Sequence, residues 1–393
     1  MVNVVLMPSV RANPVGASTS ATEADQLARV KAQFEPVPGY LNAATLGLPP
    51  IPVAEAVRAA VTGWQRGKAM ATSYDEDVDA ARKAYARLVS VPLDWVSVGS
   101  QTSVIAGLVA SSLPDGAEVV CIEGDFSSMI FPFLVHADRG VTVRQVPLPE
   151  LASSLTERTA LVAFSLVQSA SGSLCDSSAI AAAARAVGAL TFCDITQAAG
   201  WLPVAAGEYD LTTCSAYKWL CHPRGTAYLT IAPALIERVR PIHVGWYAGD
   251  DVWSSCYGPL MHLAHDARRF DVSPVWLSWV GAVPALEVMT MVPTALIGEH
   301  NIALPTEPTA DTGLPLVLGD PRGPIAFEFA LTGGAVRRSL AARAPTPLLQ
   351  PAHLTPRGPP PGPASPPPRP PPRTRPRPTP RLAPPAVPPS RLC

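Results

Sequence analysis

Between about residue 40 and residue 232, short runs of β-branched and apolar residues alternate with alanine-rich stretches of helical spacing. The apolar runs, typical of buried strands, lie at 117–123, 158–167, 188–194, 210–216 and 225–231. Residues 177–188 are typical of a helix that ends at Gly188. This alternation predicts an α/β fold with a mostly parallel central sheet and helices on both faces. Sheets of this kind bind ligands at the carboxyl ends of their strands.

The chain divides by composition into four regions. We expect an N-terminal segment at 1–39, with a helix from Thr22, then a large domain and the start of a small one at 40–303, where 276–289 also has helical spacing. Periodicity fades in 304–344, and 345–393 holds 21 of the 46 prolines, interleaved with arginine. The composition of 345–393 predicts a polyproline or disordered tail. It is compatible with an SH3-type ligand or a polybasic arm, but an arginine-rich, lysine-poor chain favours a frameshifted or aberrant C-terminus.

Charge and apolar patterning exclude several classes of protein. Residues 1–328 contain 20 basic and 31 acidic side chains, so the body of the chain is acidic and we expect no binding to nucleic acid. The N-terminus lacks a basic start, and no apolar run approaches the length of a membrane span. We therefore expect neither export nor membrane association. The seven cysteines are scattered without a C-x-x-C pair, which indicates reduced thiols in a cytoplasmic protein.

Two charged side chains follow buried strands. Lys218 is the only lysine between residues 84 and 383 and is flanked by Tyr217 and Trp219. Apolar surroundings lower the pKa of a lysine and let it form a Schiff base with an aldehyde, although an exposed lysine with a buried stem is the alternative. Asp194 ends the run at 188–194. A carboxylate buried there needs a partner, such as a protonated heterocyclic nitrogen. The alternative is that Asp194 caps the next turn.

A strand, a polar turn and an apolar helix follow one another in residues 96–113. The hydroxyls of Ser100 and Thr102, with the N–H groups at the helix start, would bind a phosphate, or would simply cap the helix. Phe126, after another strand, is a candidate aromatic lid or an ordinary core residue. A phosphate site, an acid for a ring nitrogen, an aromatic face and a Schiff-base lysine are together what pyridoxal 5'-phosphate requires.

The motifs D-x-x-Q-x-x-G at 194–200 and S-x-x-K-W-L-x-x-P-x-G at 215–225 resemble those of the class V aminotransferase family. These are fold-type I pyridoxal-phosphate-dependent enzymes, and they include cysteine-desulfurase-like and isopenicillin-N-epimerase-like proteins. The resemblance runs from 40–50 to 276–287. It implies a small-molecule amino-acid substrate and a homodimer.

The resemblance also implies roles for individual residues. Lys218 would carry the cofactor as a Schiff base, and Asp194 would pair with its pyridine nitrogen; these are the predicted catalytic residues. The remaining predicted contacts are Gln168 and Gln197 near the ring hydroxyl, Gln101, Thr102, Ser215 and Tyr217 at the phosphate, Phe126 or Ser127 stacked on the ring, and Ser273, in a segment that family dimers lend to the neighbouring site.

The sequence departs from the family pattern in two places. His222 stands where glycine is common, and the family's small C-terminal domain, with its arginine for the substrate carboxylate, is incomplete or replaced after residue 304. Cys393 is the only cysteine in that part, which disfavours a desulfurase. Transamination, epimerisation and β-elimination remain open. The alternatives are a catalytically impaired cofactor-binding homologue and an adaptor that acts through its proline-rich tail.

Overall fold

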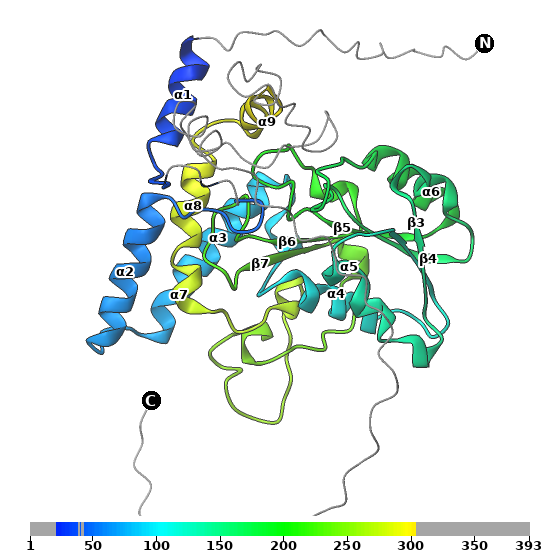
Figure 1. The fold of residues 1–393 in the computed structure, drawn as a ribbon. Helices are drawn as coiled ribbons and strands as arrows, with labels where there is room; N and C mark the ends of the chain where they lie inside the picture. The colour runs from blue at the N-terminus through cyan, green and yellow to red at the C-terminus, as the bar shows by residue number, and fades with distance from the viewer. Residues whose placement is uncertain (1–20, 38–39, 41–42, 304–393) are drawn as a thin grey trace, which may run out of the picture. The chain divides into compact units, whose positions relative to one another are not determined.

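The computed structural model describes residues 21–37, 40 and 43–303, and in this part of the chain seven strands form one sheet (Figure 1). Their order across the sheet is β1-β7-β6-β5-β4-β2-β3. The strands are β1 (Val96–Gly99), β2 (Glu118–Ile122), β3 (Thr142–Val146), β4 (Thr159–Ser165), β5 (Leu190–Asp194), β6 (Leu211–Ser215) and β7 (Ala227–Ile231). All five strands expected between residues 117 and 231 are present, with slightly shorter bounds.

The sheet is mostly parallel, as the alternating pattern predicts. Strands β3, β2, β4, β5 and β6 pair in parallel, whereas β7 is antiparallel to both β6 and β1. Two successive reversals give β1 the same direction as β6. The carboxyl ends of β1, β4, β5 and β6 therefore lie along one edge of the sheet.

Strand β3 is not among the strands expected from the sequence. It lies at the end of the sheet, pairs only with β2 among the described strands, and exposes Thr142 and Gln145. Because side chains of this edge strand face solvent, the strand needs few apolar residues. The polar sequence TVRQV therefore gives no strong strand signal.

Alternate residues of the strands pack into two hydrophobic clusters on opposite faces of the sheet. On one face, Val162 and Phe164 of β4 belong to the cluster that includes residues of α1 (Ala21–Lys31), α3 (Asp75–Leu88), α6 (Ser177–Val187) and α8 (Ala282–Met289). On the other face, Leu161 and Ala163 join residues of α4 (Thr102–Ser111) and α5 (Ser127–Leu134). Helices thus cover both faces, as expected for an α/β fold (Figure 1).

The remaining helices complete the described part of the chain. Helix α2 (Ile51–Gln65) packs with α7 (Trp276–Trp279) and α8, and α9 (Thr294–Ala303) ends it. The stretch 276–289, expected as one helix, is divided into α7 and α8 at Val280 and Gly281. Leu27 and Val30 of α1 are buried in the core, so the core begins before Tyr40, where the sequence places its start.

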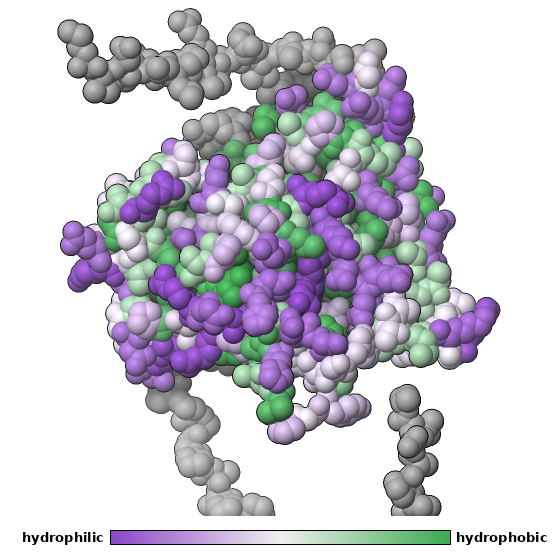
Figure 2. Space-filling model, turned by 180° about the vertical axis from the view of Figure 1, so that it is seen from behind, coloured by the Kyte–Doolittle hydropathy of each residue, from purple (hydrophilic) through white to green (hydrophobic). Residues whose placement is uncertain are grey.

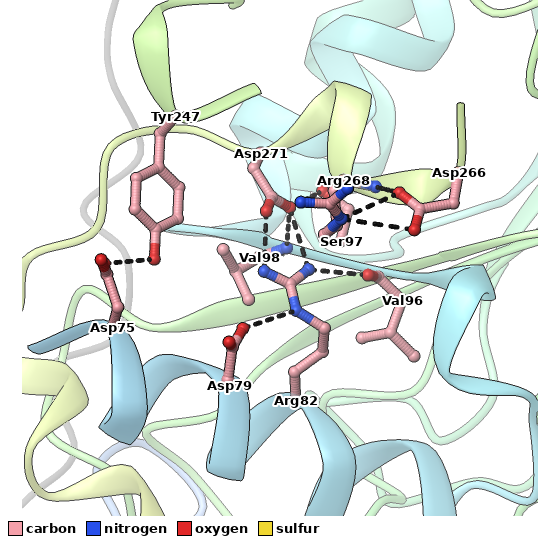
Figure 3. A network of polar contacts seen from close by, with 10 residues as sticks. All are labelled: Asp75, Asp79, Arg82, Val96, Ser97, Val98, Tyr247, Asp266, Arg268 and Asp271. Atoms are coloured by element: carbon pink, nitrogen blue, oxygen red, sulfur yellow. Dashed lines mark hydrogen bonds and ion pairs between the residues drawn. The ribbon is translucent and has the colours of Figure 1, made fainter. Parts of the chain in front are cut away.

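A buried ion pair connects α3 to β1 and to the segment before α7 (Figure 3). The two terminal guanidinium nitrogens of Arg82 donate to the two carboxylate oxygens of Asp271 at 3.1 and 2.7 Å. The Asp271 Oδ1 atom also accepts from the Ser97 hydroxyl at 2.9 Å and the Val98 N–H at 2.8 Å. These bonds compensate for the cost of burying both charges and fix the 266–275 segment against β1.

Contacts divide the chain into the units Met1–Ala344 and Pro345–Cys393, and all described residues belong to the first. The regions 304–344 and 345–393 and the expected replacement of the small domain lie outside the described residues. Figure 2 shows one face of the molecule, on which hydrophilic residues predominate and hydrophobic ones are scattered. Within the described part, no single helix meets the length and hydropathy of a membrane span; Trp276–Met289 and Thr294–Ile302 do so only together, across a 75° bend.

Candidate active site

Polar side chains converge at the edge of the sheet where the parallel strands end. Asp194 is the last residue of β5, Ser215 the last of β6 and Ser165 the last of β4. Thr102 begins α4, which follows β1 after a short turn. Because these strands share a direction, residues far apart in the sequence meet at this edge.

A continuous set of hydrogen bonds joins Thr102, Ser215 and Asp194 through Thr196. The Thr102 N–H donates to the Ser215 hydroxyl at 3.0 Å, and the two hydroxyl oxygens lie 2.9 Å apart. The Ser215 N–H donates to the Thr196 hydroxyl at 2.8 Å, and the Thr196 N–H donates to Asp194 Oδ1 at 2.8 Å. The start of α4 is thereby tied to the ends of β5 and β6.

Asp194 is 5% exposed, and its burial is the main cause of a pKa raised from 3.8 to about 6. Hydrogen bonds from Thr196 and the charge of Lys218 oppose this shift. Burial disfavours the charged form of a carboxyl group, so this carboxylate would be stabilised by a cationic N–H placed next to it.

Lys218 is 7% exposed, and burial lowers its pKa below the ordinary value. The charge of Asp194 opposes this effect, and the charge of Arg224 adds to it. Lys218 forms no ion pair within 4.0 Å with any residue of the described ranges. Its Nζ atom instead lies 5.2 Å from the centre of the Phe126 ring.

Phe126, at 42% exposure, is held by the buried carboxylate of Asp125. Asp125 Oδ1 accepts from the Phe126 N–H at 2.7 Å and from the Ser165 hydroxyl at 2.6 Å, while Oδ2 accepts from the Ser165 N–H at 2.8 Å. Asp125, which positions Phe126, is not among the residues expected from the sequence. The sequence does contain a signal for it, because Asp125 is an acidic residue shortly after β2 and immediately precedes Phe126, the candidate aromatic lid.

These side chains line one small pocket that is partly open to solvent. Seven of the residues expected from the sequence line it: Thr102, Phe126, Asp194, Gln197, Ser215, Tyr217 and Lys218. Four further residues line it that the sequence analysis did not name: Ser165, Val167, Ser169 and Thr196. Ser165, Val167 and Ser169 lie at the carboxyl end of β4 or just beyond it, which is where a sheet of this kind is expected to bind ligands.

Five other expected residues do not line this cavity. Ser100 is partly exposed, and Gln101 is the exposed N-cap of α4 without a side-chain cap bond. Gln168 is buried and donates from Nε2 to the Ser165 carbonyl at 3.0 Å. Ser127 and Ser273 are exposed. Their roles stay predictions.

A close backbone contact fixes the lysine segment. The Gly47 N–H donates to the Tyr217 carbonyl at 2.9 Å. A Cβ atom on Gly47 would lie 2.0 Å from the Lys218 carbonyl oxygen, which no side chain tolerates. Gly47 therefore allows the 43–48 segment to lie directly against the backbone that carries Lys218.

The residues present fit pyridoxal phosphate. The hydroxyls of Thr102 and Ser215 lie at the start of a ten-residue helix whose N-cap side chain leaves its first turn uncapped, an arrangement suited to a phosphate. Asp194 would be stabilised by a protonated pyridine nitrogen, and Lys218 is a buried amine without an ionic partner among the described residues. Within the same residues, no group of three or more His, Cys, Asp or Glu could hold a metal ion.

Comparison with known proteins gives a family match over residues 55–307, to the model described as aminotransferase class-V. The chain is 26% identical over 235 residues to the uncharacterized aminotransferase YcbU of Bacillus subtilis, covering 57% of this chain and 62% of YcbU. It is 30% identical over 182 residues to isopenicillin N epimerase of Streptomyces clavuligerus, covering 42% of this chain and 46% of the epimerase. The chain thus spans less than two thirds of either relative.

The fold is also found among solved structures. The complex of the cystine C-S lyase C-DES with cysteine persulfide matches with a TM-score of 0.64 at 21% identity. The match covers 73% of this chain and 82% of that one. At this level of identity, the likeness concerns the fold alone, and it agrees with the fold expected from the sequence.

Proposed function

The chain belongs to the class V aminotransferase family, whose members use pyridoxal phosphate, and we propose that it is an enzyme that acts on an amino acid with Lys218 as the Schiff-base lysine. One observation carries the proposal: Lys218, Asp194 and Phe126 line a single cavity at the carboxyl edge of the sheet. Bound pyridoxal phosphate supplies an aldehyde carbon and an electron-withdrawing ring. The residues of this chain bind it and move protons around it.

Lys218 acts first as a nucleophile and then as a base. Its lowered pKa increases the fraction of uncharged amine at neutral pH, and only the uncharged amine attacks a carbonyl carbon. With cofactor and substrate bound, the Lys218 amine would be the base that takes the proton from the substrate Cα. Burial keeps bulk water away from this nitrogen.

Asp194 would keep the pyridine nitrogen of the bound cofactor protonated. With a pKa of about 6, its carboxyl group is mainly ionised at neutral pH, and in a buried position its attraction for an N–H cation is stronger than in water. The hydroxyls of Thr102 and Ser215 and the side chain of Tyr217 would bind the phosphate, with Ser100 and Gln101 beside them in the turn before α4. Phe126 would cover the ring.

The substrate amino acid meets the same residues in each of the three candidate reactions. Transamination, epimerisation and β-elimination share removal of the Cα proton. They differ in the atom to which the proton returns, or in the loss of a β-substituent. The resemblance of residues 269–274 to a segment shared between protomers supports a homodimer, with the exposed Ser273 near the partner's site.

The visible absorption spectrum tests the proposal. Wild-type protein with added pyridoxal phosphate should show a band that borohydride abolishes, and peptide mass spectrometry should then locate the reduced cofactor on Lys218. Lys218→Ala should lack the band. Lys68→Ala, which removes an exposed lysine from the turn after α2, is the matched control and should keep it. No band in folded wild-type protein with excess cofactor would refute the proposal.

A further inference from the structure

The side-chain amide of Gln197 has its orientation fixed by two partners. Its oxygen Oε1 accepts from the indole N–H of Trp219 at 2.9 Å, and its nitrogen Nε2 donates to the carbonyl of Ala44 at 3.2 Å. An indole N–H can only donate and a carbonyl can only accept, so a flipped amide would face two unfavourable contacts. The hydrogen-bond partners thus distinguish the two ends of this amide by chemistry.

Trp219 is itself held in place. It is 3% exposed, its ring centre lies 5.5 Å from that of Trp201, and the Trp201 indole donates to the backbone carbonyl of Gln197 at 2.6 Å. Gly200 approaches the Trp219 carbonyl so closely that an added Cβ would lie 2.9 Å from it. The indole N–H therefore has little freedom to move away from Gln197.

Gln197 is also a lining residue of the cavity that contains Lys218 and Asp194. Its amide nitrogen carries two hydrogens, one of which goes to Ala44. The oxygen already accepts from Trp219. The oxygen keeps a second lone pair, but the only donor that this amide can offer a molecule in the cavity is the second N–H.

We propose that Trp219 is a positioning residue that fixes the Gln197 amide so that an N–H, and not the carbonyl oxygen, faces an acceptor atom of the bound cofactor. This inference rests on the proposed function, because it needs pyridoxal phosphate in the cavity. It assigns a task to the residue that follows the lysine. Trp219 acts through Gln197 and makes no contact of its own with the reacting atoms.

A double-mutant cycle tests the coupling. Trp219→Phe keeps an aromatic ring but removes the N–H, and it should raise the dissociation constant of pyridoxal phosphate about 3- to 10-fold, the loss expected for one hydrogen bond. Gln197→Ala should have a similar or larger effect. In the Gln197→Ala background, Trp219→Phe should have no further effect; independent, multiplying effects would overturn the inference.

Gln197→Glu tests the direction of the amide. A glutamate side chain still accepts from Trp219 but cannot donate, so it should weaken cofactor binding at least as much as Gln197→Ala. Binding as tight as in wild type would mean that the cofactor needs no donor here. Trp279→Phe is the control, because the buried Trp279 indole nitrogen has no hydrogen-bond partner in the described residues; it should leave the dissociation constant unchanged.

A measurement on the cofactor-free protein separates this inference from the proposed function. In spectra of protein labelled with ¹⁵N at the indole nitrogens, the Trp219 signal, identified with Trp219→Phe or Trp219→Tyr, should shift in Gln197→Ala. If wild-type protein takes up no cofactor, the proposed function and the donor role both fail, whatever this spectrum shows. A Trp219 signal that Gln197→Ala does not move would overturn the positioning role by itself.

Discussion

Replacing Asp194 by asparagine should make the cofactor-free protein more stable at neutral pH while weakening cofactor binding. Asparagine keeps the acceptor oxygen for the Thr196 N–H but carries no charge. In the folded protein the pKa of Asp194 is raised from 3.8 to about 6, so the folded state binds more protons than the unfolded state between these values. The free energy of unfolding of the wild type therefore falls as pH rises through this window.

The size of the effect can be calculated from the two pKa values. Each pKa unit corresponds to about 1.36 kcal/mol, so ionising Asp194 in the folded state costs about 3 kcal/mol in total. About 2 kcal/mol of this falls between roughly pH 4.5 and 7.5. Asp194→Asn removes this contribution. The free energy of unfolding of the variant, relative to that of the wild type, should therefore rise by about 2 kcal/mol between roughly pH 4.5 and 7.5.

Urea denaturation of both cofactor-free proteins at a series of pH values measures the difference directly, because other titrating groups contribute equally to each. The same preparations should show weaker binding of pyridoxal phosphate by Asp194→Asn, since the partner of the ring nitrogen loses its charge. A difference in unfolding free energy that stays constant from about pH 4.5 to 7.5 would refute the argument that burial, uncompensated by a cation, raises this pKa.

Four further substitutions test other parts of the structure. Arg82→Met leaves the buried Asp271 carboxylate without its cation and should lower the free energy of unfolding by about 3–5 kcal/mol in urea denaturation; a loss under about 1 kcal/mol would contradict the buried pairing. Gly47→Ala should displace the Lys218 backbone and weaken cofactor binding. Gly63→Ala, in open space on α2, should instead stabilise the protein by about 0.5–1 kcal/mol. Equal melting temperatures of these two variants would contradict this difference. Phe126→Leu should weaken cofactor binding by about 0.5–1.5 kcal/mol in fluorescence titration with little change in melting temperature, because the ring is partly exposed; unchanged binding would remove its role as a lid.

The sequence predicted most of the sheet because buried parallel strands leave a strong pattern. The runs that became β4 and β5 are mostly apolar and almost entirely buried, since both of their faces are covered by helices. Strand β3 gave no such pattern because it lies at an edge. Periodicity also cannot show that β7 runs antiparallel to its neighbours, because a strand buried on both faces has the same composition in either direction.

The candidate site was predictable where a residue's type and its place after a strand both pointed to the same chemistry. Lys218 and Asp194 meet both conditions, and both line the cavity. Asp125 and Thr196 act through hydrogen bonds to neighbours that only the folded chain brings close. Gln168 shows the opposite case, since an amide that looked available donates to a carbonyl three residues away.

The position of β1 has a consequence for how the chain folds. β1 comes first among the strands but pairs only with β7 among the described strands, and Thr102 meets Ser215 across 113 positions of sequence. Contacts between such distant residues form slowly, because a long loop must close before they contribute. During synthesis, β1 has no strand to pair with until residue 231 has left the ribosome. The end of the pocket at Thr102 and Ser215, the proposed phosphate site, should therefore be among the last parts of the sheet to gain protection in pulsed hydrogen exchange, well after β2, β4 and β5 have paired.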